Sequence, residues 1–276
     1  MSTSRERGVP WWMGPPDTTL DEQSALSILH LIENHTLDAA TAALLWLFVE
    51  RNASLIVAAP PRLAGKTTML TALLGLRRPE VGLVLTRGQW EDFAFLKETE
   101  PSKTWVLCNE ISPHLPMYLW GENVLTLFQS LDRGYSLGAT MHADSPQEVI
   151  GDLRHPDVAV LDALLRHLAL VVNLHAGYAR SGVLRRLRDV WMQPVARPGG
   201  AIAFRRIARW QPGGDSFLLD LSPASAAAIQ ERLAFQGDLD AEVQRHATVL
   251  GRWLAEGVRS YTDVRRKAAE FYEARG

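Results

Sequence analysis

The sequence predicts an α/β protein built around a mostly parallel sheet. Short apolar runs of strand length alternate with helical stretches between residues 54 and 174, and this alternation is typical of βα units. The chain has 276 residues, of which 47% are hydrophobic, so a sizeable core can be buried. Its single cysteine, Cys108, excludes an internal disulfide and fits a reducing compartment.

Two helices are predicted before the first strand. The first begins at a cap supplied by Thr19 or Asp21 and ends near Asn34, and the second covers 37–51. Strands then follow at 54–59, 81–86, 104–109, 136–142 and 168–174, and helices at 66–76, 90–98, 117–134 and from residue 145 onward.

Two of these helices carry sequence signals at their ends. Gly134 suits the C-terminal cap of the helix at 117–134. Ser145, followed three residues later by Glu148, forms a capping-box pattern with Pro146 in the first turn.

The last third of the chain departs from the alternation. Residues 183–195 and 201–210 alternate apolar and polar around Pro198-Gly199-Gly200 and predict a hairpin. Helices are expected at 223–235, 239–256 and 260–273. The expected organisation is an N-terminal arm with Trp11-Trp12 (1–17), a core (18–220) and a C-terminal helical subdomain (221–276).

The stretch VAAPPRLAGKTTML, residues 57–70, ends with a pattern that resembles the end of a phosphate-binding loop. Gly65-Lys66-Thr67 follows an apolar strand and opens a helix, which is the context of the pattern Gly-x₄-Gly-Lys-Ser/Thr. In such a loop the lysine contacts the β- and γ-phosphates, and the threonine hydroxyl binds Mg²⁺. The nucleotide-binding candidates are therefore Arg62, Leu63, Ala64, Gly65, Lys66, Thr67 and Thr68.

The first half of this stretch departs from the pattern. Pro60 stands where the first glycine is expected, and Pro61 follows it. Proline has no amide N–H and a fixed φ, and Leu63 is bulkier than the usual loop residue. Arg62 adds positive charge. We expect weakened phosphate binding; a chance Gly-Lys-Thr at a helix start is the alternative.

Two further residues follow predicted strands. Glu110 ends the hydrophobic run WVLCNE and is expected on a strand beside the one that precedes Lys66. An acid there holds the Mg²⁺ shell or polarises water. His142 ends the strand at 136–142, at the edge where open α/β sheets bind ligands. An acid or a histidine alone at such a position more often has a structural role. Because both are expected at the same sheet edge as Lys66, we predict that Glu110 and His142 are catalytic residues. Thr67 and Glu110 are the predicted metal ligands.

These residues lie in segments that resemble the ATPases of type II and type IV secretion, type IV pili and the archaeal flagellum. The resemblance covers roughly residues 25–273. It is carried by TLDAATAALLWLFVERNASLIVAA, by VLCNEIS…LTLFQSLDRGYSLGATMHADSPQEVI and by LALVVNL…RRLRDVWMQPV. The ending VLGRWLAEGVRSYTDVRRKAAEFYE is similar to the archaeal branch. The resemblance implies a RecA-like P-loop core, with Glu110 as the Walker B acid and His142 as the His-box residue that senses the γ-phosphate.

The resemblance also implies an activity and partners. The chain would bind Mg-ATP and hydrolyse it to drive assembly or export through an inner-membrane platform protein. It would act in the cytoplasm, at the inner face of the membrane, as a homo-hexamer or mixed with an active paralogue. No apolar run reaches the length of a membrane span, and the N-terminus is not a secretory signal.

Departures from the family favour an alternative. Glu91 and Asp92 fit its Asp box poorly in spacing, and Arg77, Arg78 and Arg87 have no firm counterpart as phosphate contacts. The family's N-terminal domain is expected to be missing. A non-catalytic subunit that partners an active secretion ATPase would explain these features.

A P-loop DNA-translocating ATPase is a third possibility. The net charge of −2 and the lack of a basic stripe weigh against nucleic-acid binding.

Overall fold

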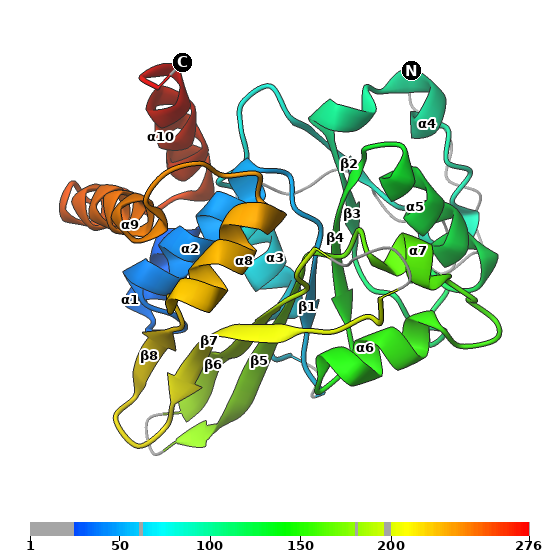
Figure 1. Ribbon diagram of the computed structural model, residues 1–276, viewed down its shortest axis with the longest axis horizontal. Coiled ribbons are helices and arrows are strands. Elements are labelled where there is room, and N and C mark those ends of the chain that lie inside the picture. Colours follow the sequence, from blue (N-terminus) through cyan, green and yellow to red (C-terminus); the bar gives the residue numbers. More distant parts are fainter. Residues whose placement is uncertain (1–24, 61–62, 180–181, 196–199, 276) are drawn as a thin grey trace, which may run out of the picture.

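The computed structural model describes residues 25–60, 63–179, 182–195 and 200–275. This part of the chain contains one eight-stranded sheet in the order β2-β3-β4-β1-β5-β6-β7-β8 (Figure 1). The strands are β1 (Leu55–Ala58), β2 (Gly82–Leu85), β3 (Thr104–Cys108), β4 (Ser136–Met141), β5 (Leu170–Ala179), β6 (Gly182–Met192), β7 (Arg205–Gln211) and β8 (Ser216–Leu219). Pairing is parallel from β2 to β5 and antiparallel from β5 to β8. The predicted α/β fold with a mostly parallel sheet is confirmed.

Three of the parallel strands are buried on both faces. All residues of β1, β3 and β4 are buried, which is the pattern of parallel strands covered on both sides. Side chains alternate between the faces. In β1, Leu55 and Val57 join one hydrophobic cluster, and Ile56 and Ala58 join the other.

Helices cover both faces of the sheet (Figure 1). One cluster contains residues of α1 (Ile28–Glu33), α2 (Ala39–Glu50), α3 (Lys66–Leu74), α8 (Pro223–Arg232), α9 (Leu239–Ala255) and α10 (Tyr261–Glu273). The other contains residues of α4 (Phe95–Glu98), α5 (Glu122–Asp132), α6 (Pro146–Leu153) and α7 (Asp162–Leu165). Among the described helices, none combines the length and the apolar character that crossing a membrane requires.

The antiparallel end of the sheet is larger than predicted. The expected pairing of 183–195 with 201–210 is confirmed by the antiparallel β6 and β7, although Pro198 and Gly199 lie outside the described residues. β5 continues to Ala179 instead of ending at residue 174, and its register with β6 shifts between Asn173 and Leu174. β8 was not predicted, because its four residues show little alternation.

Three helix predictions need correction. α1 begins after Ser27, whose side chain accepts a hydrogen bond from the His30 amide; Thr19 and Asp21 lie outside the described residues. The helix expected from residue 117 begins only after Gly121, because Gly121 has φ 66° and ψ −143°. The helix expected at 90–98 is divided into the 3₁₀ turn η2 (Gly88–Trp90) and the single-turn α4.

The predicted caps of α5 and α6 are confirmed. Gly134 follows α5 with φ 103°, the left-handed conformation that favours glycine. The Ser145 hydroxyl accepts a 3.2 Å hydrogen bond from the Glu148 amide. The Glu148 carboxylate in turn accepts from the Asp144 amide at 2.7 Å.

The C-terminal helices join the core through an aromatic cluster. Trp46 of α2 is fully buried and contacts Trp253 of α9 and Phe271 of α10, with ring centroids 5.3 and 4.8 Å apart. Its indole N–H donates to the Tyr272 hydroxyl at 2.8 Å. The residues of α8 to α10 belong to the same hydrophobic cluster as α2. The division into a core and a helical subdomain stays a prediction.

A substitution at Gly88 would test how tightly η2 packs against the loop before α5. It has φ 62°, and an added Cβ would lie 2.4 Å from the Pro116 carbonyl oxygen. We expect Gly88→Ala to lower the free energy of unfolding by about 2–4 kcal/mol, since backbone strain adds to overpacking. Urea unfolding followed by circular dichroism measures this. In Gly151→Ala, where the new Cβ meets nothing within 4 Å, stability should be unchanged or higher; equal effects would contradict the packing argument.

Candidate functional site

Three predicted residues meet at the carboxyl ends of the parallel strands. Lys66 begins α3 after β1, Glu110 follows β3, and His142 follows β4. Carboxyl ends of parallel strands share one edge of the sheet, where open α/β sheets bind ligands. The prediction that Glu110 lies on a strand beside β1 is wrong: β4 pairs with β1 on one side and β3 on the other. His142 is therefore on the neighbouring strand, and Glu110 is one strand further away.

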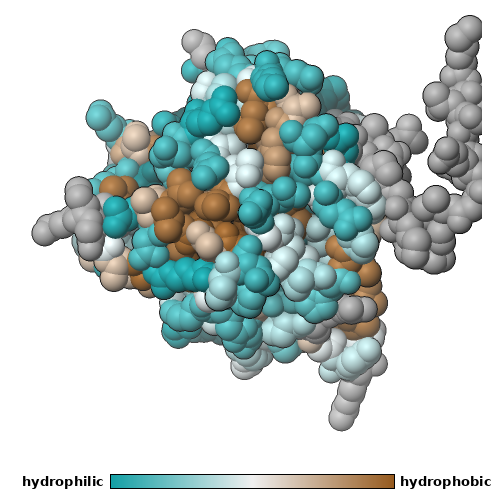
Figure 2. Space-filling view, turned by 90° about the vertical axis from the view of Figure 1, so that its right-hand side faces the viewer, coloured by the Kyte–Doolittle hydropathy of each residue, from teal (hydrophilic) through white to brown (hydrophobic). Residues whose placement is uncertain are grey.

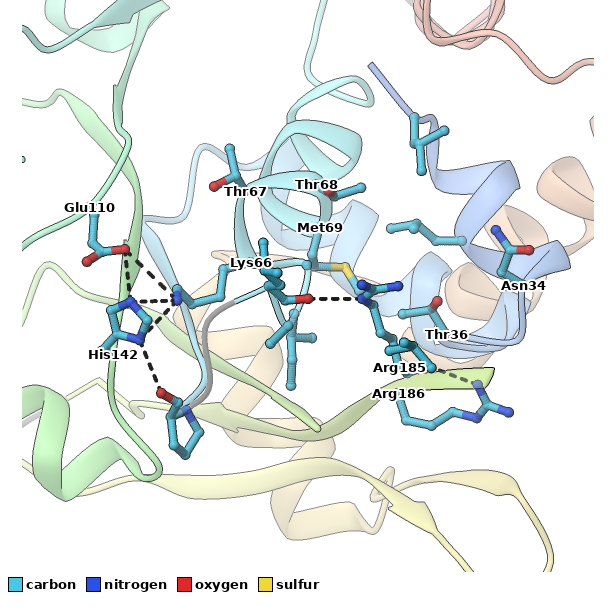
Figure 3. Close-up of a pocket in the computed structure, with 18 of the residues that line it drawn as sticks. Asn34, Thr36, Lys66, Thr67, Thr68, Met69, Glu110, His142, Arg185 and Arg186 are labelled. Carbon is cyan, nitrogen blue, oxygen red and sulfur yellow. Dashed lines mark hydrogen bonds and ion pairs between the residues drawn. The ribbon is translucent and has the colours of Figure 1, made fainter. Parts of the chain in front are cut away.

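The three side chains nevertheless touch (Figure 3). The Lys66 ammonium lies 3.3 Å from both ring nitrogens of His142 and 4.0 Å from Glu110 Oε2. His142 Nε2 lies 3.3 Å from the same carboxylate oxygen. The cluster therefore contains a cation, an acid and a titratable ring within contact distance.

Burial makes Glu110 suited to holding a cation. Glu110 is 6% exposed, and its Oε1 is buried without a hydrogen-bond partner among the described residues. A buried carboxylate oxygen without a partner is costly unless a ligand or water satisfies it. The exposed Thr67 hydroxyl lines the same cavity. The oxygen donors of Thr67 and Glu110 fit Mg²⁺, which prefers oxygen ligands.

Backbone bonds to neighbouring segments hold Glu110 in place. The Leu119 amide donates to the Glu110 carbonyl at 2.9 Å, and the Ile111 amide donates to the Thr140 carbonyl of β4 at 2.9 Å. Residues 111 and 119 form a β-bridge, which is why α5 cannot begin as early as predicted. Beside Glu110, burial raises the pKa of the Cys108 thiol to about 12, so this cysteine is neutral at physiological pH.

The described end of the loop between β1 and α3 leads into a helix N-terminus without a side-chain cap. Gly65 caps α3 with φ 90°, no side chain caps the helix, and its first turn contains no acid. An uncapped helix N-terminus with a positive dipole end favours anions. Leu63 has φ 61°, which is uncommon for a residue with a Cβ. The Pro60 carbonyl oxygen lies 3.2 Å from His142 Nδ1; Arg62 lies outside the described residues.

A cavity of about 1150 Å³ extends across this loop. Leu63, Ala64, Gly65, Lys66, Thr67, Thr68, Glu110 and His142 all line it. The remaining wall includes residues that no sequence motif indicates, among them His114. Asn34, Thr36, Arg185 and Arg186 also belong to this wall (Figure 3). For Arg185 and Arg186, nothing local in the sequence indicates this position, because the antiparallel β6 reaches the loop only through its pairing with β5.

The other charged candidates lie outside the cavity lining. Arg77 is buried and donates to the Leu74 and Val81 carbonyls. The Glu91 carboxylate accepts from the Arg87 and Phe93 amides at 2.8 Å.

Arg78 and Asp92 are occupied in ion pairs. Arg78 Nη2 lies 3.6 Å from Glu50, and Arg87 forms an ion pair with Asp92. All five candidates, Arg77, Arg78, Arg87, Glu91 and Asp92, therefore stabilise local structure.

Comparisons with known proteins give limited likenesses. No protein-family model and no curated protein matches the chain. One similar solved structure is the VirB11 ATPase of the Brucella suis type IV secretion system in complex with sulphate, at 19% identity over 54% of this chain and 50% of that chain, with a TM-score of 0.38. The ATPase DotB of Yersinia pseudotuberculosis is 14% identical over 82% of this chain and 60% of that chain, with a TM-score of 0.37. The ATPase DotB of Legionella pneumophila is 9% identical over 80% of this chain and 55% of that chain, with a TM-score of 0.33. The chain thus matches half to three fifths of their lengths. At these identities and TM-scores the three structures carry no inference about the activity of this chain. Any proposal about activity therefore has to be argued from the residues of the site.

Proposed function

We propose that this chain binds Mg-ATP and hydrolyses it as a motor ATPase of the secretion and pilus type. The observation that carries the proposal is the contact of Lys66, Glu110 and His142 beside the uncapped N-terminus of α3. A lysine and a helix N-terminus supply positive charge for phosphates, and a buried acid supplies a metal or water contact.

Each residue has a defined role in this proposal. The first turn of α3 and Lys66 would hold the β- and γ-phosphates, and Thr67 and Glu110 would hold Mg²⁺. The bound ion would neutralise charge on the phosphates. Glu110 orients a water and accepts its proton as the water oxygen attacks the γ-phosphorus. The bond to the β–γ bridging oxygen breaks, which yields ADP and phosphate. His142, in contact with both Lys66 and Glu110, senses the γ-phosphate.

A non-catalytic subunit is the second candidate function, and specific observations favour it. Pro60 places no amide N–H at the first loop position. Leu63 holds a backbone conformation that glycine adopts without strain. The acids that could have replaced an Asp box, Glu91 and Asp92, lie outside the cavity lining. Such a subunit would bind nucleotide weakly and assemble with an active paralogue.

The partners belong to the same proposal. The chain would assemble with copies of itself, as a hexamer, or with an active paralogue of the type II, type IV or archaeal machinery. It would act at the cytoplasmic face of an inner membrane on a platform protein. Figure 2 supports a protein partner, because hydrophobic residues gather into a patch on a mostly hydrophilic face. Nucleic acid is not expected at a net charge of −2.

The decisive experiment measures the wild-type chain. Phosphate release from Mg-ATP is followed across a series of protein concentrations, and binding of a fluorescent ATP analogue is titrated in parallel. A rate per subunit that rises with protein concentration would support an oligomeric ATPase. Binding without release would support the non-catalytic subunit. Absence of both, in the presence of Mg²⁺, would overturn nucleotide binding altogether.

Glu110→Gln separates binding from hydrolysis. We expect phosphate release to fall by about 100-fold or more, because the base and the charge on the metal ligand are lost, while ATP affinity changes by less than about tenfold. Single-turnover phosphate release and the binding titration measure the two effects. Glu122→Gln, at the exposed start of α5, is the matched control. Undiminished hydrolysis in Glu110→Gln would remove Glu110 from the mechanism.

A further inference from the structure

Arg185 is a cavity residue to which the proposed reaction assigns no role. It is exposed on β6 and lies across the loop from Glu110 and His142 (Figure 3). Its Nε donates a 3.1 Å hydrogen bond to the Leu63 carbonyl. Its Cδ lies 3.5 Å from the position of a Cβ added to Gly65. The side chain is therefore packed along the backbone of the loop that would hold phosphates.

The cations of the described cavity lining differ in what neutralises them. Lys66 faces the Glu110 carboxylate. Arg186 forms two hydrogen bonds of 2.7 Å to the carboxylate of Asp215, and the bond from Arg186 holds the pKa of that acid well below its usual range. Arg185 instead donates to a neutral carbonyl, and no described carboxylate lies within ion-pair distance of it. Its positive charge is thus directed at the cavity without compensation from the described residues.

We infer that Arg185 binds the α- and β-phosphates of the nucleotide, an inference that rests on the proposed function. The cluster of Lys66, Glu110 and His142 marks the γ-phosphate end of the site. A polyphosphate held at the N-terminus of α3 then extends its nucleoside end across the loop, toward Arg185 and the wall formed by Asn34 and Thr36.

The chemistry of the guanidinium group suits this role. It stays protonated in proteins, and its fork of donors matches two phosphate oxygens. The bond to Leu63 uses only Nε, so the terminal nitrogens remain for the ligand. The same bond holds the side chain beside Gly65 before nucleotide arrives, which lowers the entropy cost of binding.

The inference predicts equal effects on ADP and ATP. Titration of fluorescent ADP and ATP analogues with Mg²⁺ should show that Arg185→Ala weakens both by about tenfold, the scale of one charged hydrogen bond, with little change in kcat. The loss should shrink at high salt because the contact is ionic.

Arg185→Gln keeps a donor for the Leu63 carbonyl but no charge, and should bind both nucleotides as weakly as Arg185→Ala. Arg209→Ala, an exposed arginine of β7 outside the cavity lining, should bind as wild type.

Other outcomes overturn the inference. Recovery of affinity by Arg185→Gln would mean that Arg185 only positions the loop. Loss of ATP binding with unchanged ADP binding would place the residue at the γ-phosphate. Unchanged affinity in the Arg185 variants, beside a weakened Lys66→Ala, would overturn this inference and leave the proposed function intact. No binding by wild type would overturn both.

Discussion

Replacing Lys66 with alanine is expected to weaken ATP binding at least tenfold and to lower phosphate release by about 100- to 1000-fold. The ammonium is the one described charge that contacts both Glu110 and His142. Its removal eliminates a preorganised positive charge at the site where negative charge develops in the transition state, a loss of that size in other enzymes. Phosphate release and the binding titration measure the two effects side by side.

Controls separate this chemical role from a structural one. Lys103→Ala removes an exposed lysine that pairs with Glu100 at 3.0 Å and should leave both measurements unchanged. Thr67→Ala changes an exposed hydroxyl, so folding should be preserved while the Mg²⁺ concentration needed for half-maximal phosphate release rises. A Lys66→Ala protein that folds and hydrolyses ATP as fast as wild type would rule out this loop as the nucleotide site.

Replacing Trp46 with alanine is expected to lower the free energy of unfolding by about 3–5 kcal/mol. Trp46 is fully buried, and truncation of such a side chain costs both transfer free energy and a cavity. The variant also removes the donor to the Tyr272 hydroxyl, whose pKa is raised by burial. It leaves that partly buried oxygen with one fewer partner. Because Trp46 joins α2 to α9 and α10, the whole cooperative unit should lose stability.

Urea unfolding measured by circular dichroism and by tryptophan fluorescence tests this expectation. Trp46→Phe retains most of the packing and should cost less. Trp120→Ala, at a partly exposed residue whose ring lies 5.7 Å from that of His155, should cost the least. Two separate unfolding transitions in Trp46→Ala, with the first confined to the C-terminal helices, would mean that 221–276 is an independent subdomain, as the sequence predicts.

Local pattern predicted most of the sheet and the central residues of the site. The strands β1 to β4 lie within two residues of their predicted bounds, because buried parallel strands are continuous apolar runs. Lys66 and Glu110 were placed at one sheet edge because each follows such a run. Their contact with His142 was not predicted, since it depends on β3, β4 and β1 being parallel neighbours in that order.

Predictions from local sequence pattern were wrong where backbone conformation or the pairing of distant segments determines the bounds of an element. The start of α5 depends on the positive φ of Gly121 and on the bridge between residues 111 and 119. Neither is visible in the helical periodicity of 117–134. The same holds for β8, which forms because β7 offers it an open edge.

The α/β class, the order of elements along the chain and the loop that begins α3 at Lys66 thus follow from the amino-acid sequence alone. These properties depend on hydrophobic periodicity and on glycine and capping residues, which act over a few residues. The tertiary structure alone decided that β4 separates β1 from β3 and that β6 brings Arg185 against Leu63. Strand order and side-chain contact across a sheet depend on pairings between segments that are distant in the sequence, which no local pattern encodes.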